Sequence, residues 1–140
     1  MVHSEKNYLI DMKVFAFLVM NLIIVSSSCA QNDPSTISAA SLKRQIEAGL
    51  DGVLLDVRTP GEVAKGTLPG AVIIDFRSED FRKELKKLDK GETYFVYCHA
   101  GGRSAKTQQM MEDLGFNSVI EYSGGFGEWS QLGYPLEKKN

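Results

Sequence analysis

Four short runs of apolar residues, between positions 53 and 122, dominate the pattern of this chain. They are residues 53–57, 71–76, 93–97 and 118–122, and the last run is the least apolar. Each run is too short for a typical helix, and most are continuously apolar rather than alternating. That pattern is typical of strands buried on both faces. The runs therefore predict the central strands of a parallel sheet.

Segments with helical spacing lie before, between and after these runs. Ser38 or Ser41 can cap a helix that turns Leu42 and Ile46 inward and stops at Gly49. Three further helices are expected, with inward-facing residues in parentheses: 81–88 (Phe81, Leu85, Leu88), 104–115 (Ala105, Met111, Leu114) and 127–133 (Trp129, Leu132). Strands that alternate with helices predict an α/β fold, with a parallel sheet covered by helices on both faces.

Charged or reactive side chains follow the ends of three predicted strands. Asp56 and Arg58 follow the first strand, Asp75 the second and Cys98 the third. In parallel sheets, ligands bind beyond the carboxyl ends of the strands. This placement indicates a site, although charged residues also collect there because strands end in solvent.

The first thirty residues have a different pattern, typical of a secretory signal. Lys13 precedes an apolar run at 14–25, and small residues follow it. The run is shorter than the roughly 20 residues that span a bilayer. We expect the natural start at Met12, a signal within residues 1–29, a polar tether at 30–36 and one folded domain at 37–138.

Small residues directly before Cys29 resemble the bacterial lipobox, although Ser26 stands where a leucine-like residue is usual. The resemblance implies that Cys29 is lipidated and becomes the new N-terminus. The protein would then be an exported lipoprotein, held to a membrane on the periplasmic side by its lipid alone. The alternative is an ordinary cleaved signal. In an oxidising compartment Cys29 could then form a disulfide with Cys98 and block that thiol.

Composition excludes several classes of function. The net charge of −2 lacks the basic excess of a nucleic-acid-binding protein. Two cysteines without a CxxC or Cys/His spacing indicate neither a disulfide scaffold nor a metal site. The basic run within residues 82–90 is typical of a solvated helix face, and docking of a protein partner is the alternative.

The segment "CHAGGRS", residues 98–104, carries the candidate chemistry. Gly101 and Gly102 can adopt positive φ, which lets main-chain N–H groups point inward. A ring of N–H groups followed by a helix N-terminus attracts anions. Such surroundings bring the pKa of a thiol from about 8.5 into a range of roughly 3.5–7.5. The pattern favours a reactive Cys98 thiolate over a small buried core residue, which is the alternative.

Two neighbours of Cys98 have open roles. His99 either tunes the thiolate or faces the solvent. Arg103 either holds the loop by donating to main-chain carbonyls or offers its guanidinium to an anionic substrate.

Three motifs together resemble the rhodanese family of sulfurtransferases. They are "LLDVRTPGEVAKGTLPGAVIID", "CHAGGRS" and "GGFGEWSQLGYPL", and the resemblance covers about residues 37 to 136. Two positions depart from the family pattern: Thr67 replaces a histidine and Val63 replaces an aromatic residue. Both are expected to affect local packing rather than chemistry.

The resemblance implies a five-stranded parallel sheet between helices and a sulfurtransferase that needs no metal or organic cofactor. Cys98 would accept a sulfane sulfur from a donor such as thiosulfate, become a persulfide, and pass the sulfur to a thiophilic acceptor. The expected partners are small sulfur-containing anions or thiols, or a protein that accepts sulfur. The loop residues His99, Ala100, Gly101, Gly102, Arg103 and Ser104 would bind the sulfur, with Asp56 and Arg58 in support.

Two other functions remain as alternatives. Related phosphatases and arsenate reductases place five residues between Cys and Arg around a tetrahedral oxyanion. Here four residues separate Cys98 from Arg103, and this smaller ring fits a single terminal sulfur better. The second alternative is a binding or sulfide-sensing module without turnover. Family members of that kind tend to lose the cysteine, which this chain retains.

Overall fold

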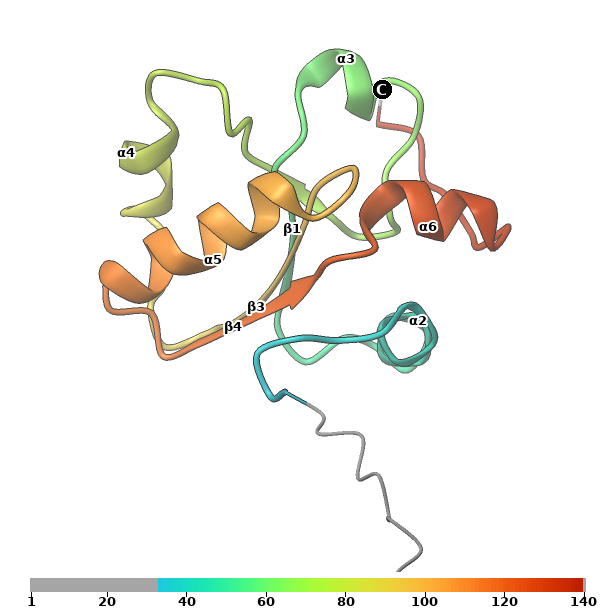
Figure 1. The fold of residues 1–140 in the computed structure, drawn as a ribbon, viewed down its shortest axis with the longest axis horizontal. Helices are drawn as coiled ribbons and strands as arrows, with labels where there is room; N and C mark the ends of the chain where they lie inside the picture. The colour runs from blue at the N-terminus through green and yellow to red at the C-terminus, as the bar shows by residue number, and fades with distance from the viewer. Residues whose placement is uncertain (1–32, 140) are drawn as a thin grey trace, which may run out of the picture. The chain divides into compact units, whose positions relative to one another are not determined.

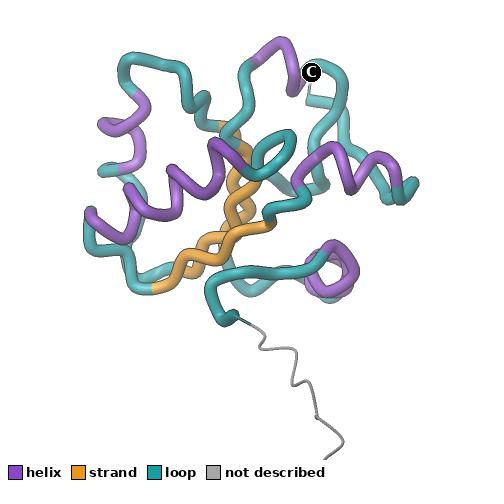
Figure 2. Tube along the Cα trace, viewed as in Figure 1, coloured by secondary structure: helices purple, strands orange, loops and turns teal. Residues whose placement is uncertain are grey.

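Four parallel strands form the centre of the fold, in the order β2-β1-β3-β4. They are β1 (Val53–Asp56), β2 (Val72–Ile73), β3 (Thr93–Tyr97) and β4 (Ser118–Tyr122), drawn in orange in Figure 2. The computed structural model describes residues 33–139. The predicted signal, the predicted lipidation of Cys29 and the start of the predicted tether therefore lie outside the described residues.

Helices cover both faces of this sheet, as the sequence predicts. They are α2 (Ala39–Glu47), α3 (Pro60–Val63), α4 (Phe81–Leu85), α5 (Gly102–Asp113) and α6 (Gly125–Gln131). Figure 1 shows α4 and α5 on one side of the strands and α2 and α6 on the other. Helix α2 begins at its predicted cap, where the Ser38 side chain accepts from the Ser41 N–H.

The continuously apolar strands are explained by two separate cores. On β3, Tyr94 and Val96 pack into the core under α4 and α5, which contains Phe81, Leu85 and Met111. Phe95 and Tyr97 point the opposite way, into the core under α2 and α6 with Leu42 and Trp129. Each large apolar side chain buried in this way stabilises the fold by about 1.5–3 kcal/mol. From Tyr94 to Tyr97, no position on β3 is left to face water.

The expectation of a five-stranded sheet is wrong for the described residues, where the sheet has four strands. A fifth strand is reduced to a single bridge between Thr36 and Glu121. The Ile37 N–H donates to the Glu121 carbonyl over 2.9 Å, and the Glu121 N–H donates to the Ser35 carbonyl over 2.7 Å. A turn directly before this point limits the pairing, because Asp33 accepts hydrogen bonds from the N–H groups of Ser35 and Thr36.

Three local predictions are also wrong. Ala105 is exposed, because α5 turns Ser104, Thr107 and Met111 inward. The two hydroxyl groups can face the interior since both are hydrogen-bonded. Leu132 follows the last residue of α6 and is 49% exposed. Strand β2 has two residues rather than six.

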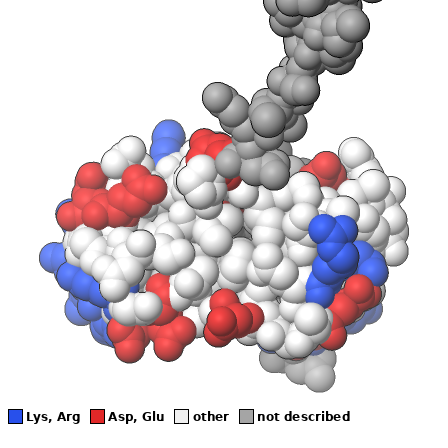
Figure 3. Space-filling view, turned by 90° about the horizontal axis from the view of Figure 1, so that it is seen from below, with Lys and Arg blue, Asp and Glu red and all other residues white. Residues whose placement is uncertain are grey.

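Charged side chains of both signs are interspersed on the face in Figure 3, around an uncharged middle. The basic run of α4 is interrupted in the same way, because Lys83 lies 3.5 Å from Asp80 and Lys87 lies 2.6 Å from Glu84. This arrangement favours a solvated face over a docking surface for that helix.

Over residues 33–139, the structure contains no helix with the length and apolar character needed to cross a membrane.

Candidate active site

Cys98 lies directly after β3, at the carboxyl end of the sheet, and is 2% exposed. It is in the lining of a pocket of about 410 Å³. The other lining residues are His99, Ala100, Gly102, Arg103 and Lys106. The structure thus places Cys98 in the lining of a pocket formed by the loop 98–104 and the start of α5.

The surroundings lower the pKa of the Cys98 thiol. Burial is the largest single influence and acts in the opposite direction, raising the pKa. It is outweighed by hydrogen bonds from Ser104, through its N–H and its hydroxyl, and from the N–H groups of Ala100 and Arg103. These groups stabilise the thiolate more than the thiol. The lowered pKa enlarges the fraction of thiolate, which is the nucleophilic form of cysteine.

Gly101 gives the loop its shape. Its φ is +89°, and a Cβ at this position would lie 2.8 Å from the Ser123 carbonyl oxygen. Any other residue would be strained here, both by its backbone and by this contact. The expectation of positive φ at Gly102 is wrong, because that residue is the first of α5, with open space where a Cβ would lie.

The start of α6 binds two main-chain carbonyls of the loop, a contact that the sequence pattern did not predict. The Phe126 N–H donates to the Cys98 carbonyl over 2.8 Å, and the Gly127 N–H donates to the His99 carbonyl over 3.0 Å. A Cβ at Gly125 would lie 2.5 Å from the Cys98 carbonyl oxygen, so only glycine permits this approach. The glycines of the "GGFGEW" motif were the available signal.

Arg103 forms a two-bond pair with Glu62 rather than bonding loop carbonyls. The distances are 2.8 Å from Nη1 to Oε2 and 2.7 Å from Nη2 to Oε1. The pair lowers the pKa of Glu62 far below its ordinary range and raises the pKa of Arg103, in both cases chiefly through these hydrogen bonds. Glu62 thereby compensates the charge of the arginine beside the pocket.

Glu62 is presented by α3, a short helix that the sequence analysis did not predict. Its Oε2 accepts hydrogen bonds from the Thr59 N–H over 3.1 Å and the Thr59 hydroxyl over 2.8 Å. Thr59, Pro60 and Glu62 have the spacing of a helix start with proline in the first turn. That pattern could have predicted the helix, but not its contact with Arg103.

Asp56 and Arg58 form a fully buried ion pair, 2.6 Å between Nη2 and Oδ2, and neither is in the pocket lining. Arg58 also donates to the Gly66 carbonyl over 2.8 Å. Its guanidinium lies 4.0 Å from the ring centre of Phe126. Burial acts to lower the pKa of Arg58, but hydrogen bonding and charge from Asp56 outweigh it and raise that pKa. Through the contact of Arg58 with Phe126, the pair supports the start of α6, which in turn binds the loop.

Thr67, where the family has a histidine, completes this buried network. Its hydroxyl donates to Asp56 over 2.9 Å and lies 2.6 Å from the Tyr97 hydroxyl, which donates to Asp56 over 2.7 Å. Burial, and then the Asp56 charge, raise the pKa of Tyr97 beyond its ordinary range. Val63, the second departure, is buried. Neither residue is in the lining of the Cys98 pocket: Thr67 hydrogen-bonds within the buried network, and Val63 packs in the interior.

The remaining predicted residues have separate surroundings. His99 is exposed, and its ring centre lies 6.3 Å from that of Phe126. Asp75 lies in the turn after β2, where it accepts from the Arg77 N–H, and it is not in the lining of the Cys98 pocket. Ser104 is fully buried at the start of α5.

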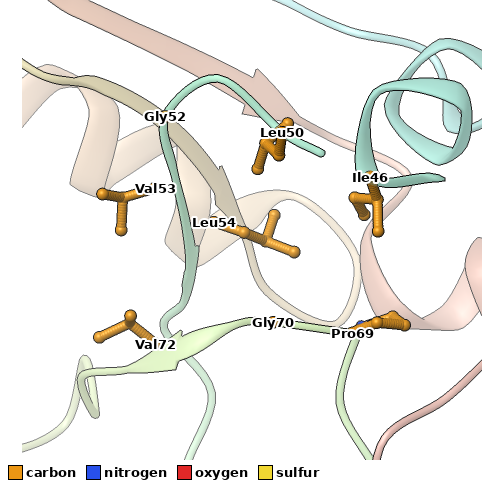
Figure 4. A pocket seen from close by; sticks show the side chains of 8 residues that line it. All are labelled: Ile46, Leu50, Gly52, Val53, Leu54, Pro69, Gly70 and Val72. Carbon is orange, nitrogen blue, oxygen red and sulfur yellow. The ribbon is translucent and has the colours of Figure 1, made fainter. Parts of the chain in front are cut away.

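A second pocket, of about 330 Å³, lies between α2 and the strands β1 and β2. Figure 4 shows its apolar lining, which includes Leu50, Val53 and Val72. No ionisable side chain is in that lining, so it lacks the groups needed for acid–base or nucleophilic chemistry. Between residues 33 and 139, no group of three or more His, Cys, Asp or Glu could hold a metal ion.

Comparisons with known proteins show which family the chain resembles. The Bacillus subtilis protein YtwF, provisionally named a sulfurtransferase, is 39% identical over 93 residues, which are 66% of this chain and 87% of YtwF. Thiosulfate sulfurtransferase 16 of Arabidopsis thaliana is 29% identical over 114 residues, or 74% of this chain and 93% of that protein.

A solved structure of a rhodanese-related protein from Thermoplasma volcanium is 31% identical. It covers 74% of this chain and 98% of its own, with a TM-score of 0.65. The sequence profile of the rhodanese-like domain matches residues 38–132. The chain therefore belongs to the rhodanese-like domain family.

Proposed function

We propose that this protein is a rhodanese-type sulfurtransferase in which Cys98 carries the transferred sulfur as a persulfide. The observation that carries the proposal is the position of the Cys98 sulfur, where N–H groups of Ala100, Arg103 and Ser104 lower the pKa of the thiol. A thiolate in the lining of a pocket can attack a small donor. The relatives named as sulfurtransferases support this reaction class.

The first half of the reaction loads the enzyme. The Cys98 thiolate attacks the outer sulfur of thiosulfate, a new S–S bond forms to Cys98, and the bond within thiosulfate breaks to release sulfite. The product is a perthiolate anion on Cys98. The loop N–H groups that hold the thiolate can stabilise this anion, as preorganised donors stabilise oxyanions in other enzymes.

The second half unloads the enzyme. A nucleophile such as cyanide or a thiolate attacks the outer sulfur, takes it as thiocyanate or a persulfide, and leaves the Cys98 thiolate. No electrons are gained or lost over the cycle, so the reaction requires no redox cofactor. The name of the Arabidopsis relative supports thiosulfate as the donor to test first.

Intact-mass measurement after incubation with thiosulfate tests the proposal. We expect a gain of one sulfur atom, reversed by cyanide with release of thiocyanate, and no gain in Cys98→Ser. Wild-type protein that stays unmodified at high donor concentration while its Cys98 still reacts with iodoacetamide would contradict transfer and favour a binding module.

Phosphatase activity is tested in parallel with a small aryl phosphate. The four-residue spacing between Cys98 and Arg103 makes a smaller ring than the five-residue loop that surrounds a phosphate, and the guanidinium of Arg103 is already paired with Glu62. We expect no Cys98-dependent hydrolysis.

A further inference from the structure

Glu121 is a buried carboxylate next to the catalytic loop that the reaction above does not use. It lies on β4 and is 7% exposed. Its Oε1 lies 2.7 Å from the Ser104 hydroxyl oxygen. In the described part of the chain, no Lys or Arg forms an ion pair with it. The carboxylate therefore depends on Ser104 as its side-chain partner.

Three acceptors lie near the Ser104 hydroxyl, which can donate a hydrogen bond to only one of them at a time. Besides Glu121 at 2.7 Å, the Gly101 carbonyl oxygen lies at 2.9 Å and the Cys98 sulfur at 3.6 Å. A hydroxyl carries one hydrogen and donates to one acceptor at a time. A carboxylate is a stronger acceptor than a neutral carbonyl, and its oxygen is also the nearest. The hydrogen of Ser104 therefore points to Glu121 in preference to the sulfur.

We propose that Glu121 is a positioning residue that acts on Cys98 through Ser104, by competing with the sulfur for the single hydroxyl hydrogen. The hydroxyl then stabilises the thiolate only in the fraction of molecules in which it turns away from Glu121. Thiolates of higher pKa are the stronger nucleophiles. Glu121 thus keeps the sulfur more reactive, at the expense of a smaller thiolate population.

This inference rests on the proposed function only in taking Cys98 as the reacting sulfur. The other ionisable groups around Cys98 are Arg103, which pairs with Glu62, and His99 and Lys106 in the pocket lining. None of them contacts the Ser104 hydroxyl. Their effect on the thiol should therefore be the same in every variant described below.

Thiolate absorbance, recorded against pH, tests the competition in the full-length protein. Glu121→Met removes the acceptor with little change in side-chain size. We expect about tenfold more thiolate at a pH below the midpoint of the wild-type titration, because the sulfur gains one hydrogen bond to a charged acceptor. Adding Ser104→Ala should abolish this gain. Thiolate that rises equally with and without the hydroxyl would overturn the proposal, since the effect would then be one of charge alone.

Glu121→Asp gives a second test that leaves Ser104 in place. The shorter side chain keeps the charge but withdraws the carboxylate from the hydroxyl. Competition predicts nearly the same gain in thiolate as in Glu121→Met, whereas an effect of charge over so short a displacement predicts only a small gain, which would refute the inference. Thermal unfolding identifies any variant that fails to fold.

Iodoacetamide rates at high pH, where every variant is fully ionised, should be lower in Glu121→Met and Glu121→Asp than in wild type. Equal rates would contradict the assigned role in reactivity. Neither readout requires sulfur transfer, so failure of this inference and failure of the proposed function are separable.

Discussion

At the scale of single residues, the partner of the Arg103 charge differs from what its position beside Cys98 suggests. An arginine beside a catalytic cysteine is expected to stabilise the thiolate or an anionic substrate. Here its guanidinium is bound through two hydrogen bonds to Glu62. Stabilisation of the sulfur is therefore left chiefly to main-chain N–H groups. Arg103 also links the start of α5 to α3 through this pair, while the nearby Cys98 contributes to raising the pKa of the guanidinium.

Glu62→Gln tests this role through stability. The pair lowers the pKa of Glu62, so its contribution is fully present above the unfolded-state pKa of about 4.3 and is lost as pH falls through the lower folded-state pKa. We expect the variant to lose about 1 kcal/mol in urea unfolding near neutral pH, and less than this near pH 3. A difference that is the same at both pH values would contradict the ion pair.

Glu84→Gln is the matched control, because Glu84 pairs with Lys87 on the exposed face of α4. Its effect on stability should be within about 0.5 kcal/mol. Sulfur transfer should be unchanged in this control and reduced in Glu62→Gln.

At the scale of elements, the loop 98–104 is held between two helices. Helix α5 begins at the C-terminal end of this loop. The N–H groups of Phe126 and Gly127, at the start of α6, donate to two main-chain carbonyls of the loop. Arg58 contacts the Phe126 ring from the side of β1. Removing one partner of its buried pair with Asp56 would typically cost about 3–5 kcal/mol. The loop is thus fixed before any substrate binds.

A pair of glycine variants tests how the loop is shaped. Gly101→Ala forces a Cβ to within 2.8 Å of the Ser123 carbonyl oxygen at a φ of +89°, and should destabilise the fold by about 1–3 kcal/mol. Gly102→Ala, one residue later, has open space in a helix and should stabilise by about 0.4–1 kcal/mol. Urea unfolding measures both. Equal effects of the two substitutions would contradict the assigned loop conformation.

Elements governed by local pattern were predictable from the sequence. The strands β1, β3 and β4 lie where apolar runs predict them, and the Ser38 cap starts α2. The inward-facing hydroxyl of Ser104 on α5 was not predictable, because its burial depends on a partner elsewhere in the fold, Glu121.

In the candidate site, too, some features could be predicted from the local sequence and others could not. The turn at Gly101 follows from the spacing of residues in "CHAGGRS". The partner of Arg103 lies 41 residues away on another helix, and no local pattern indicates such a distant contact. The contact of α6 with the loop likewise arises only when β3 and β4 lie side by side.

At the scale of the whole molecule, the electrostatics of the pocket differ from those of the chain. The chain has a net charge of −2, yet no acidic residue is in the lining of the Cys98 pocket. Arg103 is compensated by Glu62. Lys106 is exposed in the same lining, and across residues 33–139 it forms no ion pair. Lys106 is therefore the uncompensated cation at the pocket and should attract anionic donors.

Lys106→Gln tests this with two alkylating agents that differ in charge. The rate with anionic iodoacetate should fall about fivefold at low salt, corresponding to about 1 kcal/mol between charges near 4 Å in water. The rate with neutral iodoacetamide should stay the same. High salt should remove the difference. Lys86→Gln, at the exposed residue directly after α4, is the control, and equal rate losses with both agents would argue against an electrostatic role.

The bridge at Thr36 has a mechanical consequence. Hydrogen bonds join Ser35 and Ile37 to the main chain of Glu121, and the Gln108 side chain donates to the Ser35 carbonyl over 2.8 Å. Should Cys29 anchor the chain as predicted, tension from the anchor would enter the folded domain at Glu121, the residue whose carboxylate meets Ser104. Tension on the chain N-terminal to Ser35 would then strain the site of the Cys98 sulfur before it strained the rest of the sheet.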